Sequence, residues 1–510
     1  MPNVGNAEGG YAKGLMLEAP PPSAHIGGDV MAGGQHTTLL GALVAALAAL
    51  LVAIGSPTPG TAADLGGDCC ADLEERVAEL EATTVRKGNR KVSLKLSGHV
   101  NKMVLFWDDG INDDVYVVDN SDSESNFKLQ GYAHVSHSIS AGFNIEVYLL
   151  SADSFSVDAR IDGAPNENRD GILVLETASF HIKHERLGKI TIGRNSPSTD
   201  DILTLDLSSN PLAGPDTGWV DSFHLVRPHG TLGCSGAACR TGLDMDALSP
   251  EDDTSNGDII RYDSPSLHGF VLSTAFGEDD VVDLTLRYKV AGESFRFVAG
   301  IGYLWFTDET ESLTSSGDTL VIACPPPGLG QRTCVDQQQD FEVLAGSTSL
   351  MHVSSGLYVN FSAARASFNS DNGRSPLRAS VFTAPVTGEA AEDGRLWYVQ
   401  GGVKRRLLAP AIGDTTLYGE YQRWNDFGVR EDAGSVTGLA DGASEITDTS
   451  ASLWGLGIVQ DIDAAAMKLY GGLRVLEHDL RAATAANAPE GEAIPLEDFY
   501  AVALGGKINF

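Results

Sequence analysis

The chain has 510 residues, of which 42% are hydrophobic and 20% charged, and its formal net charge is −34. These proportions exclude a disordered chain and a membrane protein with many spanning helices. The acidic balance excludes a nucleic-acid partner, because phosphate binding requires a basic surface, and it favours cations as the ions that the protein attracts.

The N-terminal region contains one segment that is apolar enough to enter a membrane as a helix, Leu39–Ile54. It is short for a membrane span but long enough for the apolar core of a signal peptide. Small residues follow it and end in Thr61-Ala62-Ala63. We therefore predict cleavage after Ala63, so that residues 1–63 are a signal peptide with an N-terminal extension.

The region before the apolar segment departs from the usual pattern of signal peptides, because Lys13 is its only basic residue. The region is also long, so translation could begin at Met16 or Met31. The alternative is a signal anchor that stays attached to the mature chain.

Residues 64–90 are predicted to form a periplasmic segment. Within them, residues 71–86 carry Leu73, Val77, Leu80 and Thr84 at heptad spacing, which predicts a short helix. Two heptads are marginal for stability alone. The helix is either solvated without a partner or self-associating in an oligomer.

The six cysteines fall into close pairs: Cys69 with Cys70, Cys234 with Cys239, and Cys324 with Cys334. The last two pairs lie in loops rich in Gly, and in an exported chain such pairs predict local disulfides. Zinc binding is disfavoured, because no His lies at ligand spacing from either pair. We predict no metal and no cofactor.

The C-terminal segment 496–510 predicts a strand of an outer-membrane β-barrel. Tyr500, Val502, Leu504 and Ile508 share one parity with the terminal Phe510. The other parity carries small and polar residues. An apolar face with aromatic ends, opposed by a polar face, is typical of a strand between lipid and an aqueous lumen. The alternative is a half-buried strand of a soluble sandwich.

The rest of the chain from residue 91 follows the same period of two. We predict an all-β fold, a barrel of sixteen antiparallel strands over 91–510. The predicted strands span residues 92–106, 126–137, 141–151, 173–184, 189–194, 258–263, 269–276, 281–290, 294–306, 340–351, 356–366, 395–406, 413–424, 451–460, 465–477 and 496–510.

The connections between these strands are mostly short and long in alternation, which is typical of bacterial outer-membrane barrels with periplasmic turns and external loops. The even number of strands places both termini on the periplasmic side. The longest connection is the third external one, residues 195–257. A β-helix or propeller would show a repeated motif, and the sequence has none.

At this point the chain resembles the porins of alphaproteobacteria, of the rhizobial type. The resemblance covers the whole mature chain. Its residues are Cys69–Ala82 (CCADLEERVAELEA), Arg86–Leu94 (RKGNRKVSL), Ser97-Gly98, Leu187–Arg194 (LGKITIGR), Arg261–Pro265 (RYDSP), Gly269-Phe270 and the terminal Phe510. It implies a homotrimer in the outer membrane of a Gram-negative bacterium, with a passive channel and a third loop folded into each barrel.

The third loop carries Asp200, Asp201 and Asp206 among apolar residues. Porins that resemble this chain place basic residues on early strands, opposite an acidic third loop. On this chain the parity that faces the lumen offers the basic residues Lys95, Lys128 and Lys183, with Arg194 as a candidate of unclear parity. We therefore expect these acidic and basic sets to face each other across the pore constriction, where rings of charge set ion selectivity.

Enzyme motifs are weak in this sequence. His181 and His184 have opposite parity on a strand and do not fit a zinc protease, and Gly233–Gly236 lacks the pattern of a nucleophile elbow. The predicted function is a passive diffusion channel for ions and small hydrophilic molecules, not an enzyme. The alternatives are a substrate-specific outer-membrane channel and, less favoured, a barrel hydrolase.

Overall fold

Strands with alternating side chains make up most of the ordered chain. The computed structural model describes residues 91–159, 172–212, 214–215, 219–220, 222–231, 234–245, 256–277, 281–315, 318–321, 334–369, 393–408, 411–426, 443–484 and 491–510. All of them belong to one unit, residues 55–510. The predicted signal peptide 1–63, the segment 64–90 with its helix, and Cys69, Cys70 and Cys324 lie outside the described residues.

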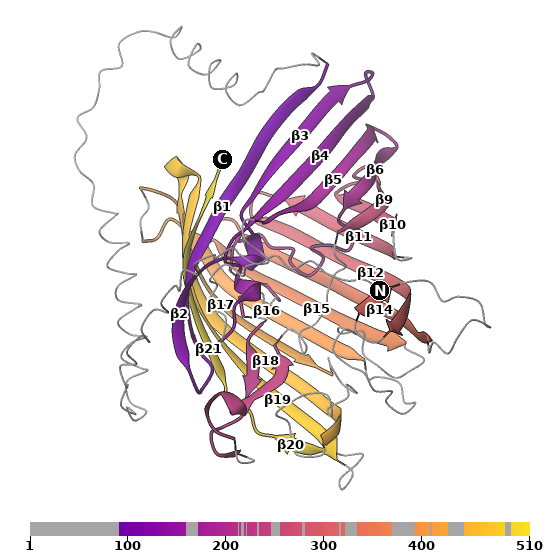
Figure 1. Cartoon of the computed structure of the whole chain (residues 1–510). Helices are drawn as coiled ribbons and strands as arrows, with labels where there is room; N and C mark the ends of the chain where they lie inside the picture. Colours follow the sequence, from indigo (N-terminus) through magenta and orange to yellow (C-terminus); the bar gives the residue numbers. More distant parts are fainter. Residues whose placement is uncertain are drawn as a thin grey trace, which may run out of the picture. The chain divides into compact units, whose positions relative to one another are not determined.

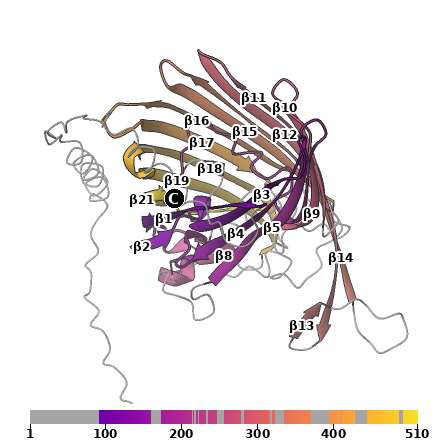
Figure 2. The same ribbon diagram turned by 90° about the horizontal axis from the view of Figure 1, so that it is seen from above.

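Sixteen wall positions close into an antiparallel barrel, as predicted (Figures 1 and 2). Closure occurs where β1 pairs with β21, with Val104 opposite Leu504. The wall consists, in chain order, of β1 (Ser93–Asp108), β2 (Asp113–Asp119) together with β3 (Asn126–His134), β4 (Ile139–Leu150), β5 (Ile172–His184), β6 (Gly188–Asn195), β9 (Gly257–Asp263), β10 (Phe270–Gly277), β11 (Val282–Ala291), β12 (Phe295–Ser315), β14 (Cys334–His352), β15 (Leu357–Asn369), β16 (Gly394–Arg405), β17 (Thr415–Asn425), β18 (Ala443–Ile462), β19 (Met467–Thr484) and β21 (Phe499–Asn509).

The second wall position is interrupted. β2 pairs with the C-terminal half of β1 and β3 with the N-terminal half, and the 3-10 turn η1 (Ser121–Ser123) lies between them. Asn120 precedes η1, and its side chain accepts from the main-chain N of Asp122 at 3.0 Å. The expectation that residues 107–125 form one long connection was therefore wrong, since the end of β1 and all of β2 lie within this range.

Several strands are longer than predicted, and short strands extend the sheet. β12, β14, β18 and β19 continue beyond their predicted ends. β13 (Asp318–Val321) pairs with β12, and β20 (Glu492–Ile494) pairs with β19. The connection between β6 and β9 contains a hairpin of β7 (His224–Val226) and β8 (Arg240–Asp244). Parts of three predicted long connections thus continue the sheet. The remaining elements are the 3-10 turns η2 (Ser154–Ser156), η4 (Gly236–Cys239) and η7 (Asp463–Ala465).

The two faces of the wall differ in chemistry. The outer face exposes large apolar side chains, such as Leu286, Ile301 and Trp305. The opposite parity carries polar side chains that are buried, among them Ser349 and Gln400 at 0% and 1% exposed. No helix among the described residues is long and apolar enough to cross a membrane.

The main cluster of buried apolar side chains joins the wall to the connection between β6 and β9. Met103 and Leu105 of β1 belong to it, as do Leu212, Trp219 and Phe223 of the connection. Trp107 and Phe223 are in ring contact, with centroids 4.9 Å apart. Side chains of this connection therefore pack against side chains of β1.

Candidate pore constriction

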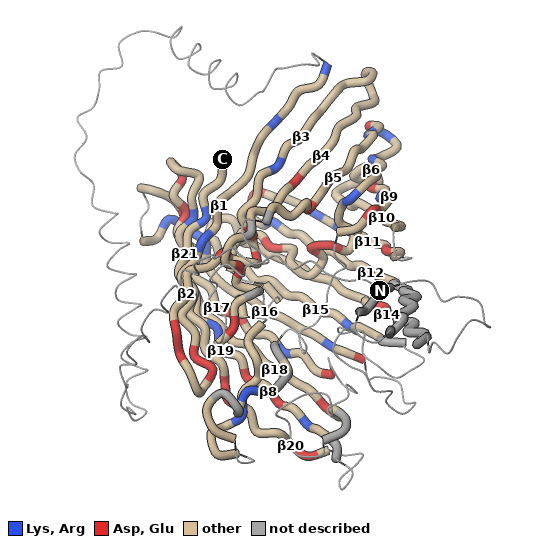
Figure 3. The backbone as a smooth tube through the Cα atoms, in the orientation of Figure 1, with Lys and Arg blue, Asp and Glu red and all other residues tan. Residues whose placement is uncertain are grey.

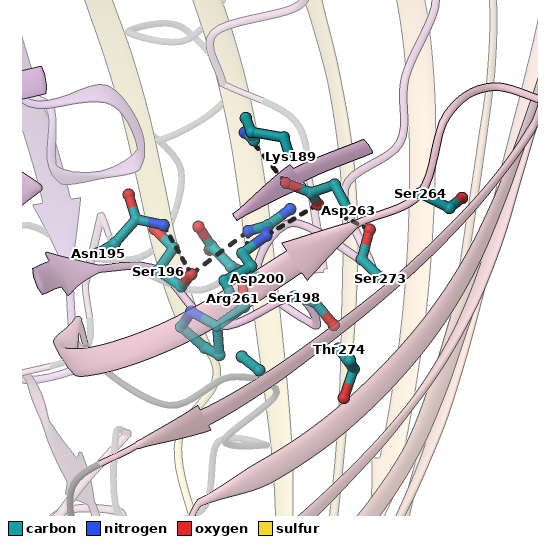
Figure 4. A network of polar contacts seen from close by, with 12 residues as sticks. Lys189, Asn195, Ser196, Ser198, Asp200, Arg261, Asp263, Ser264, Ser273 and Thr274 are labelled. Atoms are coloured by element: carbon teal, nitrogen blue, oxygen red, sulfur yellow. Dashed lines mark hydrogen bonds and ion pairs between the residues drawn. The ribbon is translucent and has the colours of Figure 1, made fainter. Parts of the chain in front are cut away.

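The connection between β6 and β9 begins in a network of polar contacts (Figure 4). The guanidinium of Arg261 on β9 donates to the main-chain oxygens of Ser196 and Pro197, at 3.3 and 2.9 Å. It also donates to Asp263 at 3.1 Å. Asp263 pairs in turn with Lys189 Nζ of β6 at 3.0 Å. One arginine and one aspartate therefore fix the start of the connection to the wall.

Asp283 of β11 fixes the next turn of the connection. Its residue is 1% exposed, and the carboxylate accepts from Ser198 Oγ at 2.7 Å and from Thr199 N at 2.8 Å. It also accepts from the main-chain N of Ala275 at 2.6 Å. A carboxylate offers about four acceptor sites, so these donors satisfy most of them. The two acids that follow, Asp200 and Asp201, thereby take a fixed place.

Asp200 and Asp201 lie beside basic residues of the nearby wall. Arg287 of β11 donates to the main-chain oxygen of Asp200. Asp201 has a left-handed backbone with φ of 59°, and its carboxyl accepts from Thr204 Oγ1 at 3.3 Å. The carboxyl keeps access to solvent, but many protein atoms lie close to it and reduce its solvation. The reduced solvation and the neighbouring Asp200 carboxylate raise the pKa of Asp201.

The connection then follows the inner faces of β14 and β15, whose serines hold its main chain. Ser347 Oγ donates to the oxygen of Ile202 at 2.5 Å, and Ser362 Oγ donates to the oxygen of Leu203 at 2.5 Å. Ile202 and Leu203 are each 2% exposed. Short hydroxyl side chains allow the connection to lie close to the wall and satisfy its main-chain oxygens.

Asp206 ends this stretch and is held by its own turn. Its carboxylate accepts from Ser208 N at 2.6 Å and from Asn360 Nδ2 of β15 at 2.7 Å. Two lysines then meet the main chain, Lys404 Nζ at 2.7 Å from the oxygen of Ser208 and Lys468 Nζ at 3.0 Å from that of Ser209. The connection has by then reached β16 and β19.

A buried ion pair lies beside a later part of the connection. Arg474 of β19 binds Glu420 of β17 at 2.9 Å, and their side chains are 1% and 0% exposed. Arg474 also donates to the oxygen of Gly214 at 3.2 Å and lies 4.5 Å from the ring centroid of Trp219. Gln422 donates to the oxygen of Pro215 at 3.1 Å. The connection therefore contacts β9 and β11 near its start and β17 and β19 further along.

The hairpin of the connection is tied to neighbouring external segments. Cys234 and Cys239 form a disulfide, the pairing that their spacing predicts. Arg240 pairs with Asp109, which follows β1, at 2.6 Å, and both side chains are buried. The partner expected for Cys334 lies outside the described residues.

The predicted basic residues lie apart from the three acids. Lys128 pairs with Glu146 of the adjacent strand at 2.6 Å. Lys95 and Lys183 are exposed on the inner parity. Arg194 shares its parity with the exposed Ile190 and donates to the oxygen of Leu175 at 3.0 Å. Within the described part of the chain, no hydrogen bond or ion pair joins these residues to Asp200, Asp201 or Asp206.

Several residues that hold the connection were not identified from the sequence: Arg261, Asp283, Arg287, Lys404 and Arg474. The available signal was parity. Arg287 lies on the charged parity of its strand, and Asp283 shares that parity. The sequence does not show which of the many wall residues of the inner parity will contact the connection between β6 and β9. No group of His, Cys, Asp and Glu among the described residues is arranged to hold a metal ion.

A family profile described as Gram-negative porin matches residues 45–479 of the chain. No curated protein matches significantly. The anion-selective porin from Comamonas acidovorans is 14% identical with a TM-score of 0.48, and the match covers 82% of this chain and 100% of that one. OmpT of Vibrio cholerae in its trimer form is 13% identical, with a TM-score of 0.44 and coverage of 82% and 99%. OmpF of Salmonella typhi in complex with daunomycin is 11% identical, with a TM-score of 0.44 and coverage of 82% and 98%.

Proposed function

Because the chain belongs to the Gram-negative porin family, we propose that its residues 195–257 are a third loop that folds inward and narrows the channel. As a member of this family the protein is located in the outer membrane and forms a diffusion channel for small solutes, and it is not an enzyme. What is proposed concerns the shape, the charge and the assembly of that channel.

The observation that carries this proposal is the set of contacts between the loop and opposite parts of the wall. Arg261 binds the start of the loop on β9, and Arg474 binds Gly214 on β19. Ser347 and Ser362 hold the main chain between these points. A segment anchored in this way crosses the lumen and leaves less of its cross-section open to solutes.

We assign the charges of the constriction to Asp200, Asp201 and Asp206 on the loop and to Lys95, Lys128 and Lys183 on the wall, with Arg194 at the start of the loop. Support comes from the lumen-side parity of the three lysines and from the anchored position of the acids. Opposite charges on two sides of a narrow passage orient dipolar solutes and select ions. The excess of acids in the chain favours cations.

The experiment is single-channel recording of the refolded mature chain in a planar bilayer under a salt gradient. Wild type is expected to give a reversal potential that favours cations, and the triple variant D200N/D201N/D206N a weaker preference. An unchanged preference in the triple variant would remove these acids from the constriction. No current from folded protein would contradict an open channel.

We further propose that the protein is a homotrimer of the alphaproteobacterial type with a short periplasmic helix over residues 71–86. The sequence block Cys69–Ala82 and the heptad spacing of Leu73, Val77, Leu80 and Thr84 support this assignment. One similar solved structure, OmpT of Vibrio cholerae, is described as a trimer form. We expect current steps in groups of three. If these steps persist after deletion of residues 71–86, the helix has no role in assembly, and if they are lost, it takes part in assembly.

A further inference from the structure

Two pairs of lysines lie directly opposite each other on neighbouring strands of the inner face. Lys183 of β5 faces Lys189 of β6, and Lys468 of β19 faces Lys507 of β21. Like charges at directly opposite positions of an antiparallel pair destabilise a sheet. The fold therefore tolerates a cost in stability at two separate places in the same channel wall.

In each pair, one lysine has an acidic partner and the other has none among the described residues. Lys189 pairs with Asp263 and Lys468 with Asp461, each at 3.0 Å. Lys507 donates to the hydroxyl of Ser123 at 2.6 Å, which leaves its charge uncompensated. Lys183 is exposed and has neither an ion pair nor a hydrogen bond within the part of the chain that the structure describes.

Both pairs lie toward the end of the barrel that carries the short turns. Lys183 and Lys189 flank the turn between β5 and β6, and Lys507 is three positions from the C-terminus. Further basic residues of the inner parity lie toward the same end. They are Lys95, Lys128, Arg261, Arg287, Lys289, Arg296 and Lys404. The acids of this zone are fewer: Glu146, Asp263, Asp414 and Asp461 of the wall, and Asp200, Asp201 and Asp206 of the connection, which lie near Arg287 and Lys404. This half of the lumen, called here the inner vestibule, is therefore positive.

The end with the long connections has the opposite charge. Exposed acids surround the rim at this end, on the turn after β1 and on the last strands, where Glu477 and Asp479 lie on the outer parity of β19: Asp113, Asp114, Glu477, Asp479, Glu492 and Asp498. Two of the arginines at this end are compensated, Arg240 by Asp109 and Arg365 by Asp393. Figure 3 shows acidic positions gathered near the ends of β2 and β19, and basic positions toward the opposite ends of β1, β3 and β6.

We propose that this protein is a channel with two zones of opposite charge along its axis, an acidic external mouth and a basic inner vestibule that collects small anions such as inorganic phosphate. This inference rests on the diffusion channel described above and concerns its selectivity. Ion flow through such a channel depends on direction. When the potential drives cations inward and anions outward, both enter through the zone that attracts them, and both accumulate.

The test is the current of single wild-type channels at equal potentials of opposite sign, in dilute and in concentrated KCl. The Debye length is about 30 Å at 0.01 M and about 3 Å at 1 M. We expect unequal currents in dilute salt and nearly equal currents in concentrated salt. We also expect inorganic phosphate on the vestibule side to reduce chloride current more than phosphate on the external side.

The variants that test the assignment are K183Q/K507Q and, as a matched control, R405Q. Arg405 lies at the same end of the barrel but on the outer parity and is exposed. We expect the double variant to lose most of the asymmetry and the effect of phosphate, and the control to keep both. Heat-modifiable migration in gels checks that each variant is folded.

Equal wild-type currents in dilute salt would overturn the inference, and so would an asymmetry that K183Q/K507Q leaves unchanged. Either result would leave the diffusion channel itself intact, since current would still flow. Failure of the channel function has a different signature, which is the absence of conductance steps in wild type and variants alike.

Discussion

Two buried charged side chains that contact the loop, Asp283 and Arg474, have specific partners. Asp283 accepts from donors of the loop and of β10, and Arg474 donates to the carboxylate of Glu420. Such groups cost free energy to bury and repay it only with complete hydrogen bonding. Each of them therefore fixes the position of the loop segment that it touches.

Removing the charge of Arg474 should destabilise the barrel strongly. R474M leaves Glu420 buried without its partner, and breaking a buried pair costs about 3–5 kcal/mol. The measurement is the midpoint of unfolding in denaturant, with R405M as a control on the outer face. The double variant R474M/E420M should lose less stability than R474M, because no unpaired charge remains. A single variant as stable as wild type would contradict the structural role of the pair.

The selectivity of the channel should respond to pH through Asp201. Its pKa is raised above the ordinary value of 3.8, so the carboxyl binds a proton at a higher pH than an ordinary Asp does. As pH falls, the loop loses negative charge and the preference for cations should decrease early. Reversal potentials recorded against pH check this. D201N should remove that early step, whereas D479N at the external rim should keep it. If wild type and D201N gave the same dependence of reversal potential on pH, Asp201 would not be the group that controls the selectivity.

At the scale of elements, sequence alternation predicts a strand well where one face meets an apolar medium and the other meets water. All sixteen predicted wall strands overlap observed ones. β2 was not predicted, because Tyr116 and Val118 of its inner face are apolar and buried, so that both faces of the strand are apolar. The extensions of β12 and β18 were not predicted, because acidic and hydroxyl residues interrupt the alternation of apolar side chains there.

The fit between the loop and β12 depends on glycine. A Cβ at Gly300 would lie 2.7 Å from the side chains of both Ile202 and Leu205. G300I should therefore push the loop away from the wall and cost about 1–3 kcal/mol, as overpacking usually does. We expect a changed single-channel conductance. The neighbouring A299I places the same side chain on the outer face, and its conductance should match wild type. Equal conductance of both variants would contradict the contact.

At the scale of the whole molecule, the pairing of the first and last strands closes the barrel. Gly98 and Phe510 exchange main-chain hydrogen bonds at 3.0 Å in both directions. The sequence predicts this closure, since β2 and β3 pair with one edge of β1 and the last strand of the barrel is the expected partner for the other edge. The path of the third loop was not predictable to the same depth. Its contacts join residues such as Ser209 and Lys468 that are 259 positions apart, and no local pattern records them.

A chain that ends at residue 495 should not form a stable barrel. It lacks β21, so β1 and β19 would present open edges in the membrane, where unpaired main-chain groups cost several kcal/mol each. The measurement is heat-modifiable migration and protease resistance after refolding. Deletion of Phe510 alone removes only the last hydrogen bonds and should give a folded barrel of lower stability. A protease-resistant barrel from the shorter chain would show that closure does not need the last strand.

The buried aromatic and aliphatic side chains of the third loop also constrain the order in which the molecule can assemble. Leu212 and Trp219 lie beside Gly472 of β19, and Phe223 contacts Trp107 of β1, so their cover comes from strands near the two ends of the chain. Contacts between distant residues form slowly, because much of the chain must be ordered first. Until the last strands arrive, this loop exposes apolar surface to water. We therefore expect the unassembled chain to stay prone to aggregation until its last strands have paired, for longer than a barrel with a polar loop would.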